Sequence, residues 1–294
     1  MHSRTTLLFL FSFFFLSGYS QSITFTKLAD LPPVLKESSG LEVTGKADIW
    51  TIVDSNRPTL FGIDEQGNFR HSIHLENVNH GWEDVTQDDQ GNMYIGDFGN
   101  NQNKRKDCRI YKIPPPDSIN GYTVRAEIIN YSYPDQKEFP PPPSKLMFDM
   151  DAMASFGDYL YLFSKNRTVP FTGYTRLYRV PNKPGNYVAE LLDSINLGPG
   201  HMYQTWVTAA DVSPDKKTLA LLTHDKVWLF HCFPQDKFFK GSKTVLPLNH
   251  FSQKEGLCFR TNNELYISDE RTENLFGGCL YRLTFDPSVL KDCP

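Results

Sequence analysis

The sequence predicts an all-β protein, a β-propeller of five four-stranded blades, and three observations support that prediction. One strand pattern recurs five times along the 294 residues, aromatic side chains make up 14% of the chain, and a strand without a partner stands near the beginning. Aromatic residues favour strands over helices, and a repeated unit of several strands is typical of propellers. With 39% hydrophobic residues, the chain can bury the core of one β domain.

The second strand of the repeat is the easiest to recognise, because it is apolar, of strand length and bounded by turn residues. It recurs at 48–54, 92–97, 159–165, 218–224 and 264–269. A short strand precedes each copy, centred on 40–41, 84–85, 152–153, 211–212 and 256–257. A third strand follows each copy, at 59–63, 109–113, 176–180, 226–230 and 279–283. A fourth strand is visible in the first four units, for example at 70–75 and 127–131.

The two ends of the chain supply the closure of the ring. The fifth unit ends before its fourth strand, and the segment 23–27 has the pattern of a strand with no neighbour in sequence. We therefore expect this N-terminal strand to complete the last blade, which also removes most of the exposed sheet edge. Six blades remain the alternative, if the long stretch 98–146 contains another sheet.

The first 20 residues have the features of a signal peptide. His2 and Arg4 precede an apolar run from Leu7 to Leu16, which is about half the ~20 residues needed to span a bilayer. The sequence thus predicts export to the periplasm or the medium, no membrane span, and one mature propeller domain over residues 21–294, expected to be a monomer.

Charge and cysteine usage narrow the range of partners. A net charge of -4 and a pI near 6.1 give no long-range attraction to phosphate backbones, so nucleic acid is excluded as a partner. The five cysteines include no C-x-x-C motif. Because export permits disulfides, Cys279 with Cys293 is one possible pair, and buried free thiols are the alternative.

In an up-and-down blade, the loop entering the first strand and the loop leaving the second strand open on the same side of the ring. Glu83, Asp151 and Glu255 occupy one equivalent position at the start of the first strands, and Asp84 and Asp211 follow one residue later. We expect these carboxyl groups to surround one mouth of the central channel. Further polar residues lie slightly upstream or in the loops that leave the second strands: Glu37, Arg57, Asp97, Asn100, Asn101, Asp149, Lys165, Arg167, His224 and Asp269.

Carboxylates that lie this close together repel one another, so some must be protonated, paired with cations or bound to a metal. Oxygen ligands without a His/Cys cluster suit Ca²⁺ better than Zn²⁺, and the candidate ligands are Glu37, Asp84, Asp97, Asp149, Asp211 and Asp269. Basic and polar side chains would hold a small polar or anionic ligand, or a glycan: Arg57, Trp82, Asn100, Asn101, Lys165, Arg167 and His224. Trp82 and Trp206 are either core residues or a stacking wall, and any single polar residue at a blade start can instead bind the backbone of the neighbouring blade.

Several motifs together resemble a family of uncharacterised exported bacterial propellers that is distantly similar to phytase-like and SdiA-regulated propellers. They are Trp82-Glu83-Asp84, Gly96-Asp97-Phe-Gly-Asn100-Asn101, Asp149-Met-Asp151-Ala-Met153, Thr208-Ala-Ala-Asp211-Val-Ser-Pro-Asp215 and Glu255-Gly256. The resemblance covers nearly the whole mature chain and implies a site at the channel mouth supported by a metal. This chain departs from the family pattern at Gly81, where an acidic residue often stands, at Asp151, where Glu is usual, and at Lys216, where Gly often follows Pro-Asp.

Two functional classes fit these observations, and the sequence leaves open whether the protein is an enzyme. The first is a binding module that holds Ca²⁺ or a small polar ligand at the carboxylate-lined mouth. The second is a hydrolase with Glu83, Asp151 and Glu255 as its catalytic residues. Its versions are a phytase-like phosphoesterase or a lactonase supported by a metal, and a glycosidase that uses a pair of carboxylates.

Overall fold

The computed structural model describes residues 23–45, 48–54, 57–78, 81–198, 200–272, 277–290 and 293. The predicted signal peptide, residues 1–20, lies outside the described residues. Within this part of the chain, no helix is both long enough and apolar enough to cross a membrane.

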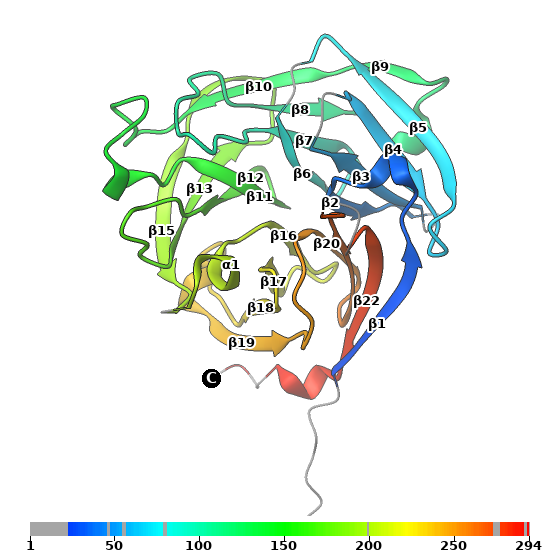
Figure 1. Cartoon of the computed structure of the whole chain (residues 1–294). Coiled ribbons are helices and arrows are strands. Elements are labelled where there is room, and N and C mark those ends of the chain that lie inside the picture. The colour runs from blue at the N-terminus through cyan, green and yellow to red at the C-terminus, as the bar shows by residue number, and fades with distance from the viewer. Residues whose placement is uncertain are drawn as a thin grey trace, which may run out of the picture.

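Five sheets, which are mainly antiparallel, are arranged as blades around one central axis (Figure 1). Blade 1 contains β2 (Ser38–Val43), β3 (Ile49–Val53), β4 (Thr59–Ile63), β5 (Phe69–Glu76) and β9 (Thr123–Arg125). Blade 2 contains β6 (Trp82–Gln87), β7 (Met93–Asp97), β8 (Arg109–Ile113), β10 (Glu127–Ser132) and β14 (Gly185–Val188). Blade 3 contains β11 (Asp149–Phe156), β12 (Tyr159–Lys165), β13 (Tyr174–Pro181) and β15 (Glu190–Asn196).

Blade 4 contains β16 (Ala209–Val212), β17 (Thr218–Leu222), β18 (Lys226–His231) and β19 (Ser242–Pro247). Blade 5 contains β20 (Lys254–Thr261), β21 (Glu264–Asp269), β22 (Cys279–Phe285) and β1 (Ile23–Asp30). Short helices lie in the connections: η1 (Pro33–Leu35), η2 (Pro116–Ser118), η3 (Pro143–Lys145), α1 (Met202–Thr205), η4 (Phe238–Lys240) and η5 (Pro287–Val289). The first strand of each blade lies innermost, as the repeat predicts.

The N-terminal strand closes the ring, which confirms the sequence-based expectation. β1, blue in Figure 1, lies beside β22, red, and pairs with it antiparallel from Ile23 opposite Phe285 to Asp30 opposite Cys279. Blade 5 therefore combines the first strand of the propeller domain with its last three strands. The ring can open at this blade only if the pairing of β1 with β22 is broken.

Two details of the predicted ring are corrected. The described residues form five blades, so the alternative of six is wrong, and the stretch 98–146 contributes only β8, β9 and β10. Blades 1 and 2 have five strands rather than four, because β9 adds parallel to β5 and β14 adds parallel to β10. In the sequence, β9 lies between two strands of blade 2, and β14 lies between two strands of blade 3. Each added strand therefore links the blade that contains it to the following blade.

The hydrophobic core is divided into five clusters, each lying between two successive blades. The cluster between blades 1 and 2 shows the principle, because Trp50 and Ile52 of β3 pack there with Val85 of β6 and Ile95 of β7. Side chains alternate between the two faces of each strand, so every blade buries apolar residues on both faces. The five interfaces hold the innermost strands at the axis in a fixed arrangement.

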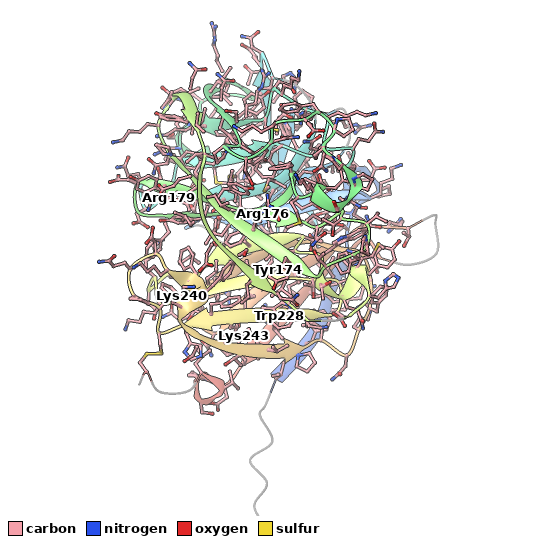
Figure 2. All side chains as sticks on the ribbon, turned by 90° about the vertical axis from the view of Figure 1, so that its left-hand side faces the viewer. Tyr174, Arg176, Arg179, Trp228, Lys240 and Lys243 are labelled. Atoms are coloured by element: carbon pink, nitrogen blue, oxygen red, sulfur yellow. A yellow bond between two sulfur atoms is a disulfide. The ribbon has the colours of Figure 1, made fainter. Side chains whose placement is uncertain are left out.

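At the rim, ion pairs reinforce the contact between blades 3 and 4. Figure 2 shows this side of the molecule, with Arg179, Lys240 and Trp228 labelled. Arg179 of β13 lies 2.5 Å from Asp236, which follows β18, and Lys240 of η4 lies 3.0 Å from Asp193 of β15. Lys243 of β19 covers the ring of Trp228 at 5.1 Å.

The predicted disulfide pairing is wrong. Cys293 is bonded to Cys232, at the end of β18 in blade 4, and Cys279 is a buried free thiol, as are Cys108 and Cys258. Cys279 cannot reach Cys293 because it begins β22 inside blade 5, whereas the segment after β22 runs along blade 4, where Thr244 donates to the carbonyl of Val289.

Candidate functional site

A repeated backbone irregularity positions the candidate site. Four innermost strands each carry a one-residue β-bulge near their beginning, and the bulged residues are Gly40, Glu83, Asp151 and Glu255. A bulge leaves its extra residue unpaired in the ladder and redirects its side chain. Three of the four bulged residues are thus the carboxylates that the repeat placed at one equivalent position.

A buried lysine joins the carboxyl groups of different blades. Lys165 ends β12, and its Nζ donates to Oδ2 of Asp151 and lies 3.6 Å from Oε1 of Glu255. The same Glu255 oxygen lies 3.7 Å from Nε2 of His224 in blade 4. Together with Glu83, these residues form what we call the mouth cluster: Glu83, Asp151, Lys165, His224 and Glu255. Lys165, Asp151, His224 and Glu255 are all more than nine-tenths buried.

Glu83 has room in the cluster because the neighbouring loop has a glycine, without a side chain, at position 99. A Cβ atom on Gly99 would lie 1.7 Å from Oε1 of Glu83, so any side chain at position 99 would occupy the place of that carboxyl group. Gly99 in the motif Asp97-Phe-Gly-Asn-Asn101 is therefore a requirement of the site rather than of the turn.

The environment displaces the pKa values of the cluster in opposite directions. Burial, and then the charge of Asp151, raises the pKa of Glu83 well above its ordinary value. Burial also raises the pKa of Asp151, against the opposing effect of Lys165. For Glu255, burial is outweighed by Lys165 and His224, and its pKa is lowered. The cluster therefore combines carboxyl groups whose pKa values are raised with one whose pKa is lowered.

The ion pair between Arg167 and Asp149 lies next to the mouth cluster and stabilises the loops beside it. Arg167 donates from Nε to Oδ2 of Asp149 at 2.7 Å and from a terminal nitrogen to Oδ1 of Asn101. The other oxygen of Asp149 accepts the backbone N–H of Asn100 at 2.7 Å. Arg167 also stacks on Trp206, with 4.3 Å between the guanidinium carbon and the ring centroid. Trp206 is 9% exposed, so it supports the cations rather than presenting a free stacking face.

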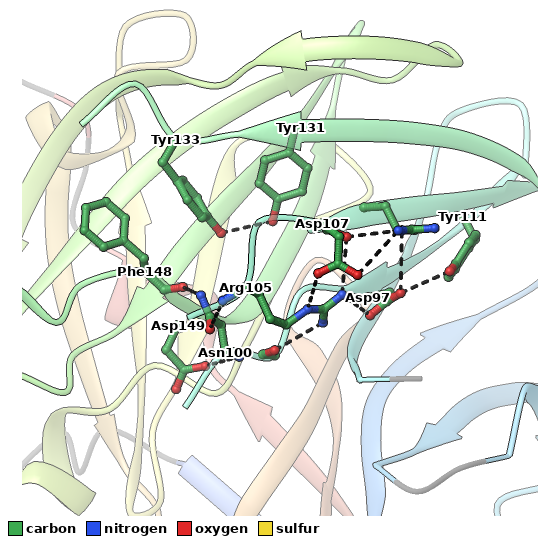
Figure 3. Close-up of polar contacts among 11 residues, drawn as sticks. Asp97, Asn100, Arg105, Asp107, Tyr111, Tyr131, Tyr133, Phe148 and Asp149 are labelled. Carbon is green, nitrogen blue, oxygen red and sulfur yellow. Dashed lines mark hydrogen bonds and ion pairs between the residues drawn. The ribbon is translucent and has the colours of Figure 1, made fainter. Parts of the chain in front are cut away.

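Figure 3 shows how the loop after β7 is held beside Asp149. Arg105 lies 2.8 Å from Oδ1 of Asp97 and donates to the carbonyl of Gly99, while Tyr111 donates to Oδ2 of Asp97 at 3.0 Å. Asp269 in blade 5 has the same kind of partners, because it accepts the N–H of Cys279 at 2.8 Å and the hydroxyl of Tyr281 at 2.9 Å. Both carboxyl groups serve to fix loops.

Asp84 and Asp211 also have partners that fully occupy them, and these partners are backbone groups. Asp84 accepts the N–H of Val85 and, from blade 3, that of Met153 at 2.7 Å. Asp211 accepts the N–H of Val212 and, from blade 5, that of Phe259 at 2.7 Å. Glu42, which the sequence analysis did not single out, accepts the N–H of Val43 and, from blade 2, both the N–H and the side-chain amide of Gln87. We call Glu42, Asp84 and Asp211 the clasp carboxyls.

The remaining predicted residues lie at the edges of the site or in the core. Glu37 pairs with Lys36 at 3.3 Å near the surface, and Arg57 is exposed. Trp82 is 2% exposed and packs in the core between blades 1 and 2, so it offers no stacking wall. Lys216, which departs from the resembled family, has φ +61°, the left-handed conformation that glycine adopts most easily.

Comparisons with known proteins agree on the fold. No protein-family model and no curated protein sequence matches the chain. Among solved structures it is similar to the PQQ-bound form of an aldose sugar dehydrogenase from Streptomyces coelicolor, with a TM-score of 0.51 and 9% identity, over 91% of this chain and 99% of that one. It is also similar to a protein of unknown function from Bacteroides thetaiotaomicron, with a TM-score of 0.51 and 10% identity, over 91% and 77% of the two chains.

A streptogramin B lyase matches with a TM-score of 0.45 and 9% identity, over 90% of this chain and 98% of that one. At such identities the likeness concerns the propeller fold and not the chemistry. The five blades and the closure of the ring are given by the sheets of this chain itself, and the function has to be argued from the site.

Two residues near the mouth, Tyr203 and Phe251, escaped the sequence analysis, and a third, Glu270, lies in a loop that the repeat predicts to reach the mouth. Tyr203 of α1 stacks on His224 with 5.7 Å between ring centroids, and Phe251 approaches the same ring edge-on at 5.9 Å. Tyr203 is 43% exposed and Phe251 is 61% exposed. Burial and the charge of Glu255 raise the pKa of Glu270. Glu270 directly follows Asp269 and was within reach of the loop argument, whereas no spacing in the sequence links Tyr203 or Phe251 to His224.

The arrangement does not favour a divalent cation. Among the described residues, no three His, Cys, Asp or Glu side chains are placed to hold one metal ion, whereas Ca²⁺ takes six to eight oxygen ligands. The ammonium of Lys165 lies where a cation between Asp151 and Glu255 would be, and Asp84, Asp97, Asp149, Asp211 and Asp269 are bound to protein donors. The side chains as arranged do not fit Ca²⁺, and calcium binding stays a prediction of the sequence.

Proposed function

We propose that the protein binds a sugar unit, a small polar ligand rich in hydroxyl groups, at the mouth cluster. The observation that carries this proposal is the meeting of three carboxyl groups from three blades with one buried lysine. The group combines carboxyl groups with raised pKa values, a carboxyl group with a lowered pKa, and the ammonium of Lys165, so it can both donate to and accept from a hydroxyl-bearing ligand.

The rim of the cluster supports the same ligand. Tyr203 and Phe251 are exposed aromatic rings on either side of His224. Nε2 of His224 is buried, and the 3.7 Å that separates it from Oε1 of Glu255 is too long for a hydrogen bond, so a ligand hydroxyl would satisfy a group that is costly to leave unpaired. A binding site of this kind, apolar rings with a few convergent polar groups, is typical for small ligands.

A phosphate ester fits the charges less well. Four carboxyl groups, Glu83, Asp149, Asp151 and Glu255, stand against the two cations Lys165 and Arg167, and both cations are already paired. An anionic ligand would have to displace these carboxylates. The phytase-like version of the hydrolase, which rested on the family resemblance, is therefore the weaker one.

Calorimetric titration of the mature chain with mono- and oligosaccharides tests the binding proposal. We expect at least one saccharide to bind, and Glu255→Gln to weaken its binding about tenfold or more, because the charged acceptor is lost. Glu76→Gln, the same change at an exposed glutamate of β5, should leave the affinity unchanged. A protein that binds no saccharide, or an E255Q variant that binds as well as the wild type, would contradict the proposal.

The pKa of Glu83 is raised and that of Glu255 is lowered. This difference favours a second candidate function, hydrolysis of the bound glycoside. A raised pKa suits Glu83 to the role of general acid, and a lowered pKa suits Glu255 to the role of base or nucleophile. Release of reducing sugar from an oligosaccharide that binds would support this candidate, provided that Glu83→Gln and Glu255→Gln each lower the rate by roughly 10²-fold or more. Binding without turnover would leave the protein a binding module.

A further inference from the structure

A groove between blades 4 and 5 adjoins the mouth cluster. Its volume is about 580 Å³, and it is bounded by β1, by β22 and by the segment 248–252 that connects β19 to β20. The ring of Phe25 stacks on that of Tyr281 at 4.8 Å, and the ring of His250 lies 5.3 Å from Tyr281. One wall of the groove is therefore aromatic, and its edges are polar, with Lys27, Asp30, Asn249 and Ser252.

Phe251 connects this groove with the mouth cluster. It lines the groove, is 61% exposed, and has its ring 5.9 Å from that of His224. His224 in turn lies 3.7 Å from Glu255. A ligand that extends from the mouth cluster past Phe251 would enter the groove without crossing a blade.

One buried cation fixes the two sites relative to each other. Lys254 is fully buried, and its Nζ donates to the carbonyl of His224 at 3.1 Å, to the carbonyl of His250 at 3.0 Å and to the hydroxyl of Ser252 at 2.9 Å. The first acceptor belongs to the mouth cluster and the other two to the wall of the groove. Such preorganisation lowers the ordering cost of binding a ligand that spans both.

We propose that the groove is a second sugar-binding subsite, so that the ligand of this protein is an oligosaccharide that occupies the mouth cluster and the groove together. This inference rests on the proposed function of the mouth cluster. The chemistry of the groove favours a sugar ring, because a pyranose has an apolar face that packs on aromatic rings and a polar edge that takes hydrogen bonds.

The test compares ligand lengths. Gluco-, xylo-, arabino- and galacto-oligosaccharides of one to four units are titrated calorimetrically into the wild type and into Phe251→Ala. For the wild type we expect a disaccharide or longer chain of one series to bind about tenfold more tightly than its monosaccharide. Phe251→Ala should remove this gain, so that the longer chain binds no more tightly than its monosaccharide, whereas Phe69→Ala, at another exposed phenylalanine on β5, should preserve it.

Three outcomes would overturn the inference. Equal affinity for one and for several sugar units would leave no role for the groove. An aryl glycoside of a single sugar that binds as tightly as the disaccharide would assign the groove to an aromatic group instead. Equal weakening of all lengths by Phe251→Ala would place Phe251 in the mouth site alone. In these cases the proposed function stands, whereas the absence of any saccharide binding would remove both.

Discussion

Two sets of buried carboxyl groups line the centre of this propeller, and they differ in what they bind. The clasp carboxyls, Glu42, Asp84 and Asp211, accept backbone N–H groups of their own strand and of the next blade. The carboxyl groups of the mouth cluster meet side chains, above all Lys165. A carboxyl group that binds backbone amides stabilises the fold. One that contacts another ionisable side chain can exchange a proton or bind a hydroxyl group of a ligand.

The difference arises between neighbouring residues of one strand. Glu83 is the extra residue of a bulge and Asp84 is the next residue in the ladder. The bulge turns the first toward the mouth and leaves the second facing blade 3. Identical chemistry at adjacent positions thus has two separate roles, and substitutions should separate them.

The largest effect is expected from Lys165→Met. Removal of the ammonium leaves Asp151 and Glu255 buried without their cation, and breaking a buried pair in this way costs about 3–5 kcal/mol. Urea unfolding at pH 8 measures the loss. Lys240→Met is the matched control, because its ion pair with Asp193 is at the surface and should cost under about 1 kcal/mol. Equal losses for the two variants would argue against a special role for the mouth lysine.

The next effect is expected from Asp84→Ala, which leaves the N–H groups of Val85 and Met153 buried without an acceptor. We expect about 3 kcal/mol of lost stability from two unsatisfied donors. Glu83→Ala, one residue away, should cost less than about 1 kcal/mol, since it removes a carboxyl group that repels Asp151. If urea unfolding ranked the two variants in the opposite order, the division into clasp and mouth carboxyls would be wrong.

A smaller effect is expected from pH. Burial raises the pKa of Asp151 to about 8 and that of Asp211 to about 7. The folded protein therefore holds these protons more tightly than the unfolded chain, so their stabilisation is complete below the unfolded pKa of about 4 and is lost as the pH rises through 7 and 8. Lowering the pH from 8 to 5 should therefore raise the free energy of unfolding.

His231 and His250, whose pKa values burial lowers, oppose this trend but are less buried. Thermal melts of the wild type and of Asp151→Asn across this pH range check the expectation. The variant should show a flatter profile, and a wild type that loses stability on acidification from pH 8 to 5 would contradict it.

The smallest effect is expected from calcium. Since Lys165 already lies between Asp151 and Glu255, adding Ca²⁺ after EDTA should shift the thermal midpoint by less than about 1 °C. A bound metal would raise it by mass action. A clear calcium-dependent rise would restore the metal site predicted from the sequence, and it would show that Lys165 moves aside for the ion.

The fold was largely predictable because strand patterns and turn residues are local signals. β4, β8 and β21 begin and end where the sequence placed them. The fifth strands β9 and β14 were not predictable, because each is short and gains its partner only by reaching back to the preceding blade. The partner of Cys293 depends in the same way on where the segment after β22 runs.

The site was predictable in position but not in the roles of its members. The equivalence of Glu83, Asp151 and Glu255 follows from the repeat, whereas the bulge that separates Glu83 from Asp84 has no signature in the sequence. The contact between Phe251 and His224 joins two loops of blades 4 and 5 and likewise requires the fold. Local patterns thus locate a carboxylate, and only its surroundings decide what it does.

The bulges also limit how the channel mouth can be redesigned. Gly40, the bulged residue of blade 1, has φ +65°, and a Cβ there would lie 2.6 Å from the backbone nitrogen of Val85. Among the described pairs, β16 of blade 4 joins β17 without a bulge. A mutational library aimed at new ligands should therefore vary positions 83, 151 and 255. Although the ring has five blades, in the part of the chain that the structure describes only three of them place a bulged residue with a side chain at the channel mouth.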